Sequence, residues 1–226
     1  TRPIDLHLKA LELLGADIVL DRGYVLASAP CGLKGIDITF PFVSVGATEN
    51  IMMAATLADG ETRLINAARE PEIIDLANCL TSMGASIEGI GSDTLVIQGR
   101  KSLGGVCHTV MPDRIETGTY AMAAAATGGD VLLKGAQPEY LVAVTDKLTE
   151  SGAVITEIPG KNGGLRIACQ RGGVVGVDVM TEPFPGFPTD LQAQFMALLS
   201  LSDGASMITE QILSLIHISE PTRHTR

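Results

Sequence analysis

The chain has 226 residues, of which 46% are hydrophobic and 19% charged, and its formal net charge is −10. This composition is typical of a globular protein with room for one large domain or two small ones. The acidic charge and the lack of a Lys/Arg cluster argue against a nucleic-acid partner. The longest apolar runs are too short to cross a bilayer, so we expect no membrane insertion.

The cysteines are Cys31, Cys79, Cys107 and Cys169. None belongs to a C-x-x-C pair, and their spacing indicates neither a zinc site nor a disulfide framework. We therefore expect no metal. Free thiols without a recognisable signal peptide favour a cytoplasmic protein.

Helical and strand patterns alternate along the chain. Helices are expected near residues 3–14, 46–58, 71–83, 116–126, 138–151 and 190–201. Strands are expected near residues 17–21, 24–28, 36–41, 63–66, 86–90, 94–98, 106–111, 130–134, 153–158, 164–169, 176–180 and 206–209.

One plan recurs in the segments 3–15, 71–84 and 138–152. Each has Pro where a helix would begin and Gly where it would end, followed by Ala and a strand pattern. Successive copies are about 69 residues apart, which is too long for the common solenoid repeats. The period suits a repeated βαβαββ unit, so we expect an α/β fold built from copies of that unit.

Each copy also predicts a second helix, entered through residues 42–49, 112–119 and 187–190. The bodies of these helices are small and apolar, which suggests that they are buried. If the copies pack around a pseudo-threefold axis, the N-termini of these helices point the same way. Converging helix N-termini favour an anion.

The most specific stretch is Phe187–Phe195. Thr189 with Gln192 three residues later predicts a capping box, which places Asp190 at the first helical position. Partial positive charge on the N–H groups there favours an ionised carboxylate that can accept a proton from a hydroxyl. The alternative is that Asp190 only helps the helix to start.

Five motifs in order then resemble one family, the UDP-N-acetylglucosamine 1-carboxyvinyltransferases. The resemblance covers Arg2 to Ile212. The motifs are Arg2–His7, Val43–Thr48, Asn66–Glu72, Pro112–Gly118 and Phe187–Phe195.

The resemblance implies the enolpyruvyl transferase fold, an inside-out α/β barrel. Each of its two domains holds three βαβαββ units, and the active site lies in the cleft between the domains. Residues 1–111 would be the C-terminal part of the first domain and residues 112–212 part of the second, both incomplete.

The family transfers the enolpyruvyl group of phosphoenolpyruvate to the 3′-hydroxyl of UDP-N-acetylglucosamine and releases phosphate. This is the first committed step of peptidoglycan synthesis, and so it serves cell-wall biogenesis, cell shape and cell division in the cytoplasm. Both partners are substrates, and the resemblance implies no cofactor.

By resemblance, Asp190 is the catalytic base and a ligand of the sugar hydroxyl. The remaining substrate-binding residues would hold the uracil side and the phosphates, and Arg114 would line the cleft unless it forms a local ion pair with Asp113. These binding residues are Arg2, Pro3, Ile4, Asp5, Leu6, Val43, Ser44, Val45, Gly46 and Arg114. His7 is expected to form hydrogen bonds rather than to act in catalysis.

The chain departs from the family pattern in three places. The family has a reactive Cys on a Gly-rich loop just before the Arg-Pro-Ile-Asp motif, as well as an early Lys-Asn motif, and this chain begins at Thr1. Phe42 stands where many members have Lys. Residues 213–226 resemble a translated sequencing-library adapter, and we expect them to be a non-native tail.

These departures predict that the 226-residue chain by itself gives no turnover. Three other interpretations remain open. The chain is related to the 3-phosphoshikimate enolpyruvyl transferase of the shikimate pathway, or it is a non-catalytic UDP-sugar-binding fragment, or it is a non-functional fragment.

Overall fold

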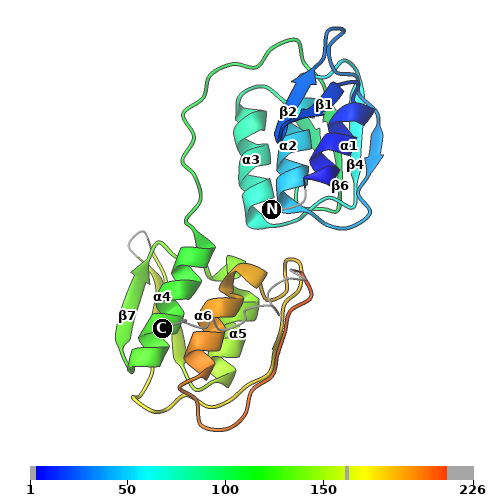
Figure 1. Cartoon of the computed structure of the whole chain (residues 1–226). Coiled ribbons are helices and arrows are strands. Elements are labelled where there is room, and N and C mark those ends of the chain that lie inside the picture. Colours follow the sequence, from blue (N-terminus) through cyan, green and yellow to red (C-terminus); the bar gives the residue numbers. More distant parts are fainter. Residues whose placement is uncertain (1–3, 161–162, 213–226) are drawn as a thin grey trace. The chain divides into compact units, whose positions relative to one another are not determined.

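A computed structural model describes residues 4–160 and 163–212. The chain divides into two compact units, Thr1–Met111 and Pro112–Arg226, called here the first and the second unit (Figure 1). The predicted site residues Arg2 and Pro3 and the tail expected at 213–226 lie outside the described residues. Within those residues no helix is long and apolar enough to cross a membrane.

The first unit contains one complete βαβαββ unit preceded by a helix and a hairpin. Its leading elements are α1 (Asp5–Leu13), β1 (Asp17–Asp21) and β2 (Tyr24–Ser28). The complete unit consists of β3 (Asp37–Thr39), α2 (Val45–Ala55), β4 (Glu61–Ile65), α3 (Pro71–Ser82), β5 (Ser86–Glu88) and β6 (Thr94–Gln98). Its sheet has the order β3-β4-β6-β5, in which β3 and β4 are parallel and the other neighbours antiparallel.

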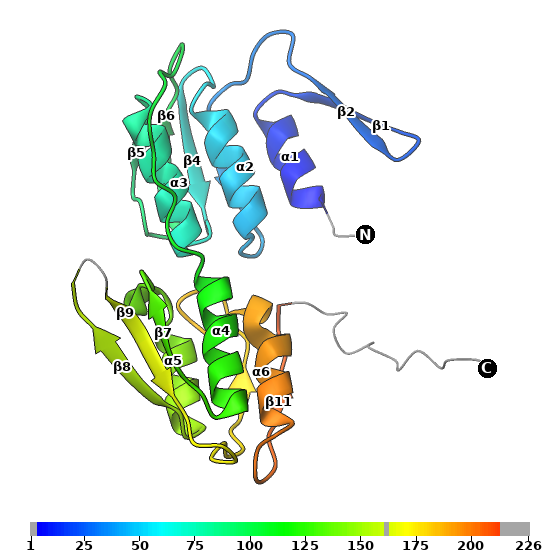
Figure 2. The same ribbon diagram turned by 90° about the vertical axis from the view of Figure 1, so that its left-hand side faces the viewer.

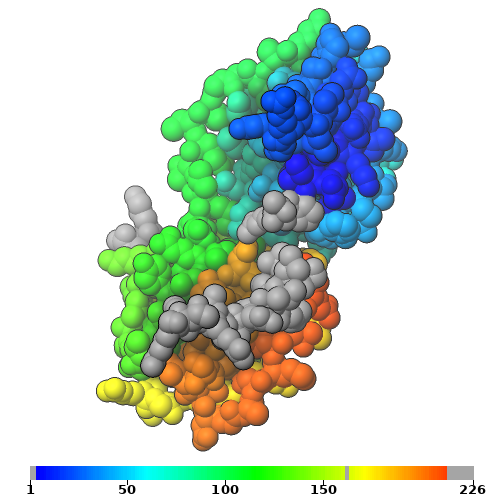
Figure 3. Space-filling view, in the orientation of Figure 1, coloured from blue at the N-terminus to red at the C-terminus, as the bar shows by residue number. Residues whose placement is uncertain are grey.

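The helices α2 and α3 bury their apolar stripes against this sheet, and α1 packs on α2. The largest fully buried side chains there are Leu14, Ile51, Met52, Leu64, Ile73, Leu95 and Ile97. Burying such a side chain contributes about 1.5–3 kcal/mol relative to exposure, so this stripe holds α2 and α3 in place. The β1–β2 hairpin lies at the surface, where Leu20 is 69% and Tyr24 74% exposed (dark blue in Figure 3).

The second unit repeats the same order of elements. It contains α4 (Arg114–Thr127), β7 (Asp130–Lys134), the 3-10 turn η1 (Pro138–Tyr140), α5 (Val142–Glu150), β8 (Val154–Ile158), β9 (Gly164–Ala168), β10 (Val179–Met180), the 3-10 turn η2 (Thr189–Leu191), α6 (Gln192–Leu199) and β11 (Ile208–Thr209). The antiparallel sheet β7-β9-β8 corresponds to β4-β6-β5, and the parallel pair β10–β11 corresponds to β3–β4. The repeat predicted from the sequence is therefore present.

The glycines that end the repeated helices have the predicted role. Gly15, Gly84 and Gly152 have φ angles of 98°, 105° and 101°. A left-handed residue just after a helix is strained for any residue with a side chain, so glycine favours the stop at each of these positions.

Three expectations from the sequence differ from the structure. Residues 106–111 form no strand, because the segment has no ladder partner and leaves Val110 73% exposed. The helices expected to begin at 138 and 190 begin as 3-10 turns. The helices expected to be buried bury one face only, since Met53, Tyr120 and Met196 are 45%, 57% and 48% exposed.

Candidate functional site

In the first unit, the predicted binding residues gather at the first turns of α1 and α2. Ile4 is the N-cap of α1 and 44% exposed, and Asp5 is the first helical residue and exposed. Leu6 is half-buried and packs against the core. Asp5 thus leaves its carboxylate at the surface near the N-terminus of α1.

The stretch Val43–Gly46 forms the start of α2. Ser44 is the N-cap in extended conformation, and its hydroxyl oxygen accepts a long hydrogen bond of 3.4 Å from the Ala47 amide. The amides of Val45 and Gly46 are the first two of the helix, and so they have no acceptor within it. Phe42, which stands where many members of the resembled family have Lys, is 61% exposed.

His7 joins these two helix starts. The side-chain amide nitrogen of Asn50 lies 3.1 Å from His7 Nδ1, and the two form a hydrogen bond. The ring lies against the first turn of α2, since a Cβ on Gly46 would be 3.4 Å from His7 Cε1. His7 therefore forms a hydrogen bond, as the sequence suggested. We call the residues Ile4–Leu6 and Val43–Gly46 the α1–α2 group.

Three carboxylates lie near this end of the first unit. Burial, followed by the negative charges of Glu72 and Glu70, raises the pKa of the Glu49 carboxyl above its usual value. Glu70 is the N-cap of α3 and only 8% exposed. The effect of Glu70 and Glu72 on Glu49 depends on how α2 and α3 pack, and the motif Asn66–Glu72 does not predict it.

In the second unit, Arg114 is the first residue of α4. Asp113 caps that helix, because one of its carboxylate oxygens accepts from the amides of Ile115 and Glu116 at 2.8 and 3.0 Å. Arg114 is 7% exposed, and its guanidinium carbon lies 5.9 Å from the centroid of the Phe184 ring. A cation over an aromatic face is favourable, and here it packs Arg114 against the loop that leads to η2.

Asp190 lies in the middle of η2, with its side chain exposed. The capping box expected of Thr189 and Gln192 is wrong. The Thr189 hydroxyl instead donates to Glu210 Oε2 over 3.0 Å, and the N-cap of α6 is Leu191, which has no side-chain capping bond. A carboxylate is a stronger acceptor than a neutral group, so it competes successfully for the hydroxyl.

Glu210 is a residue that the sequence analysis missed. It is 8% exposed and lies directly after β11, and it contacts a turn 21 residues earlier in the chain. The only sequence signal was a Glu next to an apolar strand pattern, which does not distinguish a buried carboxylate from a surface one.

The helices α4 and α6 run side by side in the second unit (Figure 2). The Gln194 side chain donates to the Thr119 hydroxyl over 3.1 Å, and a Cβ on Gly118 would be 2.4 Å from Leu191 Cδ1. The turn that carries Asp190 is thereby packed against the first turns of α4. The expectation that pseudo-equivalent helix N-termini point the same way holds for these two helices.

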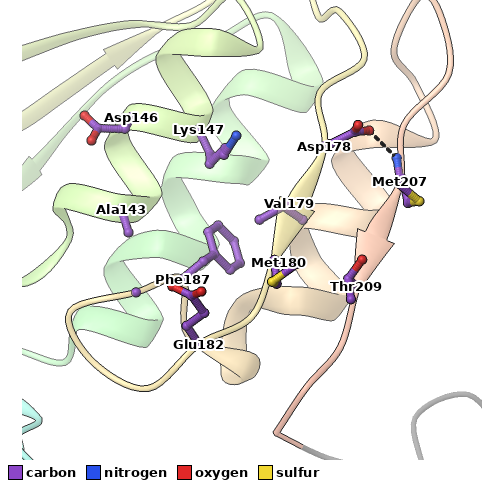
Figure 4. Close-up of a pocket in the computed structure, with 11 residues that line it drawn as sticks. Ala143, Asp146, Lys147, Asp178, Val179, Met180, Glu182, Phe187, Met207 and Thr209 are labelled. Atoms are coloured by element: carbon purple, nitrogen blue, oxygen red, sulfur yellow. Dashed lines mark hydrogen bonds between the residues drawn. The ribbon is translucent and has the colours of Figure 1, made fainter.

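An open pocket of about 460 Å³ lies between α5 and the β10–β11 pair (Figure 4). Its lining includes Lys147, Met180 and Phe187 and contains none of the predicted site residues. It therefore plays no part in the candidate site. In the described part of the chain, no group of three or more His, Cys, Asp or Glu residues is placed to hold a metal ion.

Comparison with known proteins shows similarity to carboxyvinyltransferases over nearly the whole chain. The model of the EPSP synthase family (3-phosphoshikimate 1-carboxyvinyltransferase) matches residues 1–219. A UDP-N-acetylglucosamine 1-carboxyvinyltransferase of Acidiphilium cryptum is 59% identical over 225 residues, which cover 99% of this chain and 53% of that protein. A protein of the same name from Paramagnetospirillum magneticum is 57% identical, over 99% of this chain and 51% of that protein. Another from Rhodospirillum centenum is 59% identical, over 98% of this chain and 51% of that protein. The chain thus spans about half the length of these relatives.

Solved structures support the fold. The enolpyruvyl transferase NikO from Streptomyces tendae has a TM-score of 0.78 at 22% identity, over 92% of this chain and 52% of that one. An EPSP synthase from Acinetobacter baumannii has a TM-score of 0.62 at 24% identity, over 92% and 48%. The expected enolpyruvyl transferase fold is confirmed. The chain belongs to the EPSP synthase family, and the relatives that share 57 to 59% of its residues are UDP-N-acetylglucosamine 1-carboxyvinyltransferases.

Proposed function

We propose that the whole protein transfers the enolpyruvyl group of phosphoenolpyruvate to the 3′-hydroxyl of UDP-N-acetylglucosamine. The observation that carries this proposal is the 59% identity to a UDP-N-acetylglucosamine 1-carboxyvinyltransferase over 99% of this chain. The related 3-phosphoshikimate reaction has weaker support, since the solved EPSP synthase shares 24% identity with the chain.

The chemistry needs a base, a proton donor and binding groups for anions. The sugar hydroxyl loses its proton to a base while its oxygen bonds to C2 of phosphoenolpyruvate, and C3 gains a proton. The tetrahedral intermediate then releases phosphate from C2, and C3 loses a proton to restore the double bond. Positioned acid–base groups and cationic or N–H donors accelerate such a step.

Asp190 is assigned the role of the base. Its exposed carboxylate lies in the N-terminal turn before α6, where a substrate hydroxyl can reach it. The turn is packed against α4 through Leu191 and Gly118, so its position is fixed by buried contacts rather than by a loose loop. Such support is what a catalytic carboxylate requires.

The α1–α2 group is assigned to the UDP moiety. The free amides at the start of α2 and the Ser44 hydroxyl suit a diphosphate, because the first amides of a helix donate outward to anions. Asp5, together with the backbone of Ile4 and Leu6, would contact the uridine. Arg2 and Pro3 are assigned to the same end by their place in the motif, and Arg114 to the vicinity of Asp190.

The product of this reaction is a precursor of peptidoglycan. We therefore place the protein in the cytoplasmic phase of cell-wall biogenesis, on which cell shape and cell division depend. Phosphoenolpyruvate enters as a substrate, and the assigned residues act without a cofactor.

Calorimetric titration of the chain tests the UDP-sugar assignment. We expect UDP-N-acetylglucosamine to bind, UMP to bind more weakly because it lacks the β-phosphate, and shikimate 3-phosphate not to bind. Replacing Ser44 by Ala should weaken UDP-N-acetylglucosamine binding by about 10-fold to 100-fold, the loss of one charge-assisted hydrogen bond. Ser202→Ala, which alters a hydroxyl in the other unit, is the control. Preferential binding of shikimate 3-phosphate would contradict the proposal.

A chimera tests turnover. In it, residues 1–212 replace the aligned half of the Acidiphilium cryptum relative, and the relative supplies the part of its length that this chain does not cover. We expect phosphate release that requires both substrates and that falls by about 10²-fold or more in Asp190→Asn, as is usual for loss of a general base. Phosphate release unaffected by Asp190→Asn would exclude Asp190 as the base.

A further inference from the structure

We propose that Glu210 is a positioning residue for Asp190, an inference that rests on the proposed function. Glu210 acts through a neighbour of the assigned base rather than at the reacting atoms. Its carboxylate contacts the residue that immediately precedes Asp190, and it does so from the end of a different strand.

Glu210 is held by its own set of hydrogen bonds. Oε1 accepts from the Thr181 hydroxyl at 2.8 Å and from the Ile212 amide at 2.6 Å, while Oε2 accepts from the Thr189 hydroxyl at 3.0 Å. Thr181 is completely buried and Glu210 is 8% exposed. A buried ionised carboxylate needs such donors, because desolvation without them is costly.

The same carboxylate connects three elements. Thr181 directly follows β10, Glu210 directly follows β11, and Thr189 opens η2. The Thr181 hydroxyl also accepts from the Gln211 amide at 3.0 Å. Just before the two strands begin, the Asp178 carboxylate accepts from the Met207 amide at 2.7 Å, which holds the start of β11 to the start of β10 (Figure 4). The Asp190 turn is thus connected to a parallel strand pair rather than to its own helix alone.

This connection explains why Thr189 does not cap α6. Its hydroxyl is directed to Glu210, so the chain before Gln192 forms a 3-10 turn that is closed by the Leu191 amide on the Pro188 carbonyl at 3.1 Å. Asp190 lies at the centre of that turn, with one neighbour bonded to Glu210 and the other, Leu191, completely buried. The backbone that carries Asp190 is therefore held on both sides.

The first test measures the turn in the 226-residue chain itself. Glu210→Gln keeps the size of the side chain but replaces one acceptor oxygen by a donor, and Thr189→Val keeps the shape but removes the hydroxyl. Both should speed hydrogen exchange of the Leu191 amide by about tenfold, the loss of one hydrogen bond to a charged group. Thr189→Ser should restore slow exchange, and Glu157→Gln, an exposed carboxylate on β8, should leave it unchanged. Unchanged exchange in Glu210→Gln would overturn the inference.

The second test uses the chimera described above and separates positioning from mere folding. Glu210→Gln and Thr189→Val should each lower kcat by about 10-fold to 100-fold, as a small misplacement of a catalytic group does, with KM for UDP-N-acetylglucosamine within about twofold. Their effects should be less than additive, because both break the same contact. Thr189→Ser should recover most of kcat.

The outcomes separate the inference from the proposed function. If Asp190→Asn abolishes turnover while Glu210→Gln and Thr189→Val retain full kcat, the proposed function stands and the positioning role is overturned. If Asp190→Asn retains turnover, Asp190 is not the base, and a positioning role in catalysis falls with it. Loss of kcat in all three variants, with slow exchange and kcat both rescued by Thr189→Ser, supports both.

Discussion

Gly118 in α4 faces the side chain of Leu191 in the turn that carries Asp190. A Cβ at position 118 would lie 2.4 Å from Leu191 Cδ1 and 3.1 Å from Cδ2. Leu191 is completely buried and so has no open space into which to turn. The absence of a side chain at residue 118 is what lets the two helices approach, and it connects the start of α4 to the position of Asp190.

Gly118→Ala should therefore destabilise the second unit although alanine favours helices. Overpacking typically costs about 1–3 kcal/mol, and the gain in helix propensity returns about 1 kcal/mol. We expect a net loss of about 1 kcal/mol in the free energy of unfolding, measured by urea denaturation. Gly105→Ala, where nothing lies within 4 Å of the added carbon, is the matched control. Equal stability of both variants would show that Leu191 repacks freely.

Asp113→Ala should weaken the start of α4. The substitution removes the acceptor for two backbone amides, and loss of an N-cap side chain costs about 0.5–2 kcal/mol. Asp113→Asn keeps an acceptor oxygen and should recover most of this loss. Thermal unfolding of both variants and the wild type measures the difference. A full loss in Asp113→Asn would show that the negative charge, rather than the hydrogen bonds, carries the effect.

Glu49 gives a prediction about pH. Burial and the charges of Glu72 and Glu70 raise its pKa in the folded chain, so the folded state holds this proton more tightly than the unfolded state does. The resulting stabilisation is complete below the unfolded pKa and is lost as the pH rises through the folded pKa. Glu49→Gln should therefore be more stable than the wild type at pH 7, with the difference fading below about pH 4.

The measurement is thermal unfolding at a series of pH values. Glu88→Gln, which alters an exposed carboxylate on β5, is the control. Its stability relative to the wild type should not increase as the pH rises. A difference between Glu49→Gln and wild type that is the same at every pH would mean that the carboxylate cluster contributes through shape rather than charge.

His108 anchors the exposed segment that follows β6. Its Nε2 lies 3.1 Å from Asp75 Oδ1 on α3, and both side chains are about one-fifth exposed, at 21% and 22%. Further back, the Gly104 amide donates to the Met83 carbonyl at 2.8 Å. The segment thus contacts α3 and its C-cap at two points, and of these the His108–Asp75 contact involves the residue further along the chain.

His108→Ala should release the segment near residues 105–111 with little effect on global stability. A partly exposed pair contributes about 0–1 kcal/mol, which corresponds to at most about fivefold more opening. Thermolysin, which cleaves next to apolar residues, should cut there up to about fivefold faster. Asp75→Ala should behave alike, and the double variant should add nothing further. His7→Ala is the control, and equally fast cleavage in it would contradict a specific anchor.

Most of the architecture follows from local sequence patterns. Pro and Gly punctuation at 71 and 84, the apolar stripe of Ile73 and Leu80, and the strand alternation after Gly84 predicted α3 and β5 to within two residues, because these signals act through neighbouring backbone. The repeat extended the same prediction to the second unit. The strand expected at 106–111 failed because pairing needs a partner that the pattern does not encode.

Local sequence patterns predicted only part of the candidate site. The sequence placed Asp190 at the first helical position, and the structure has it one turn earlier, in the 3-10 turn before α6. It assigned Thr189 the wrong partner, since it weighed only residues within the next turn. The local sequence does not show whether Thr189 bonds to residue 192, in the next turn, or to a carboxylate 21 residues further along the chain.

The sequence by itself therefore determined the repeated order of helices and strands, the glycine stops and the place of the acidic residue at a helix start. Only the tertiary structure decided how that residue is held: the Thr189 hydroxyl turns to buried Glu210, and Gly118 admits Leu191. The physical reason is range. Helix starts and stops depend on a few consecutive residues, whereas burial decides which distant donor a carboxylate must satisfy and which side chains meet.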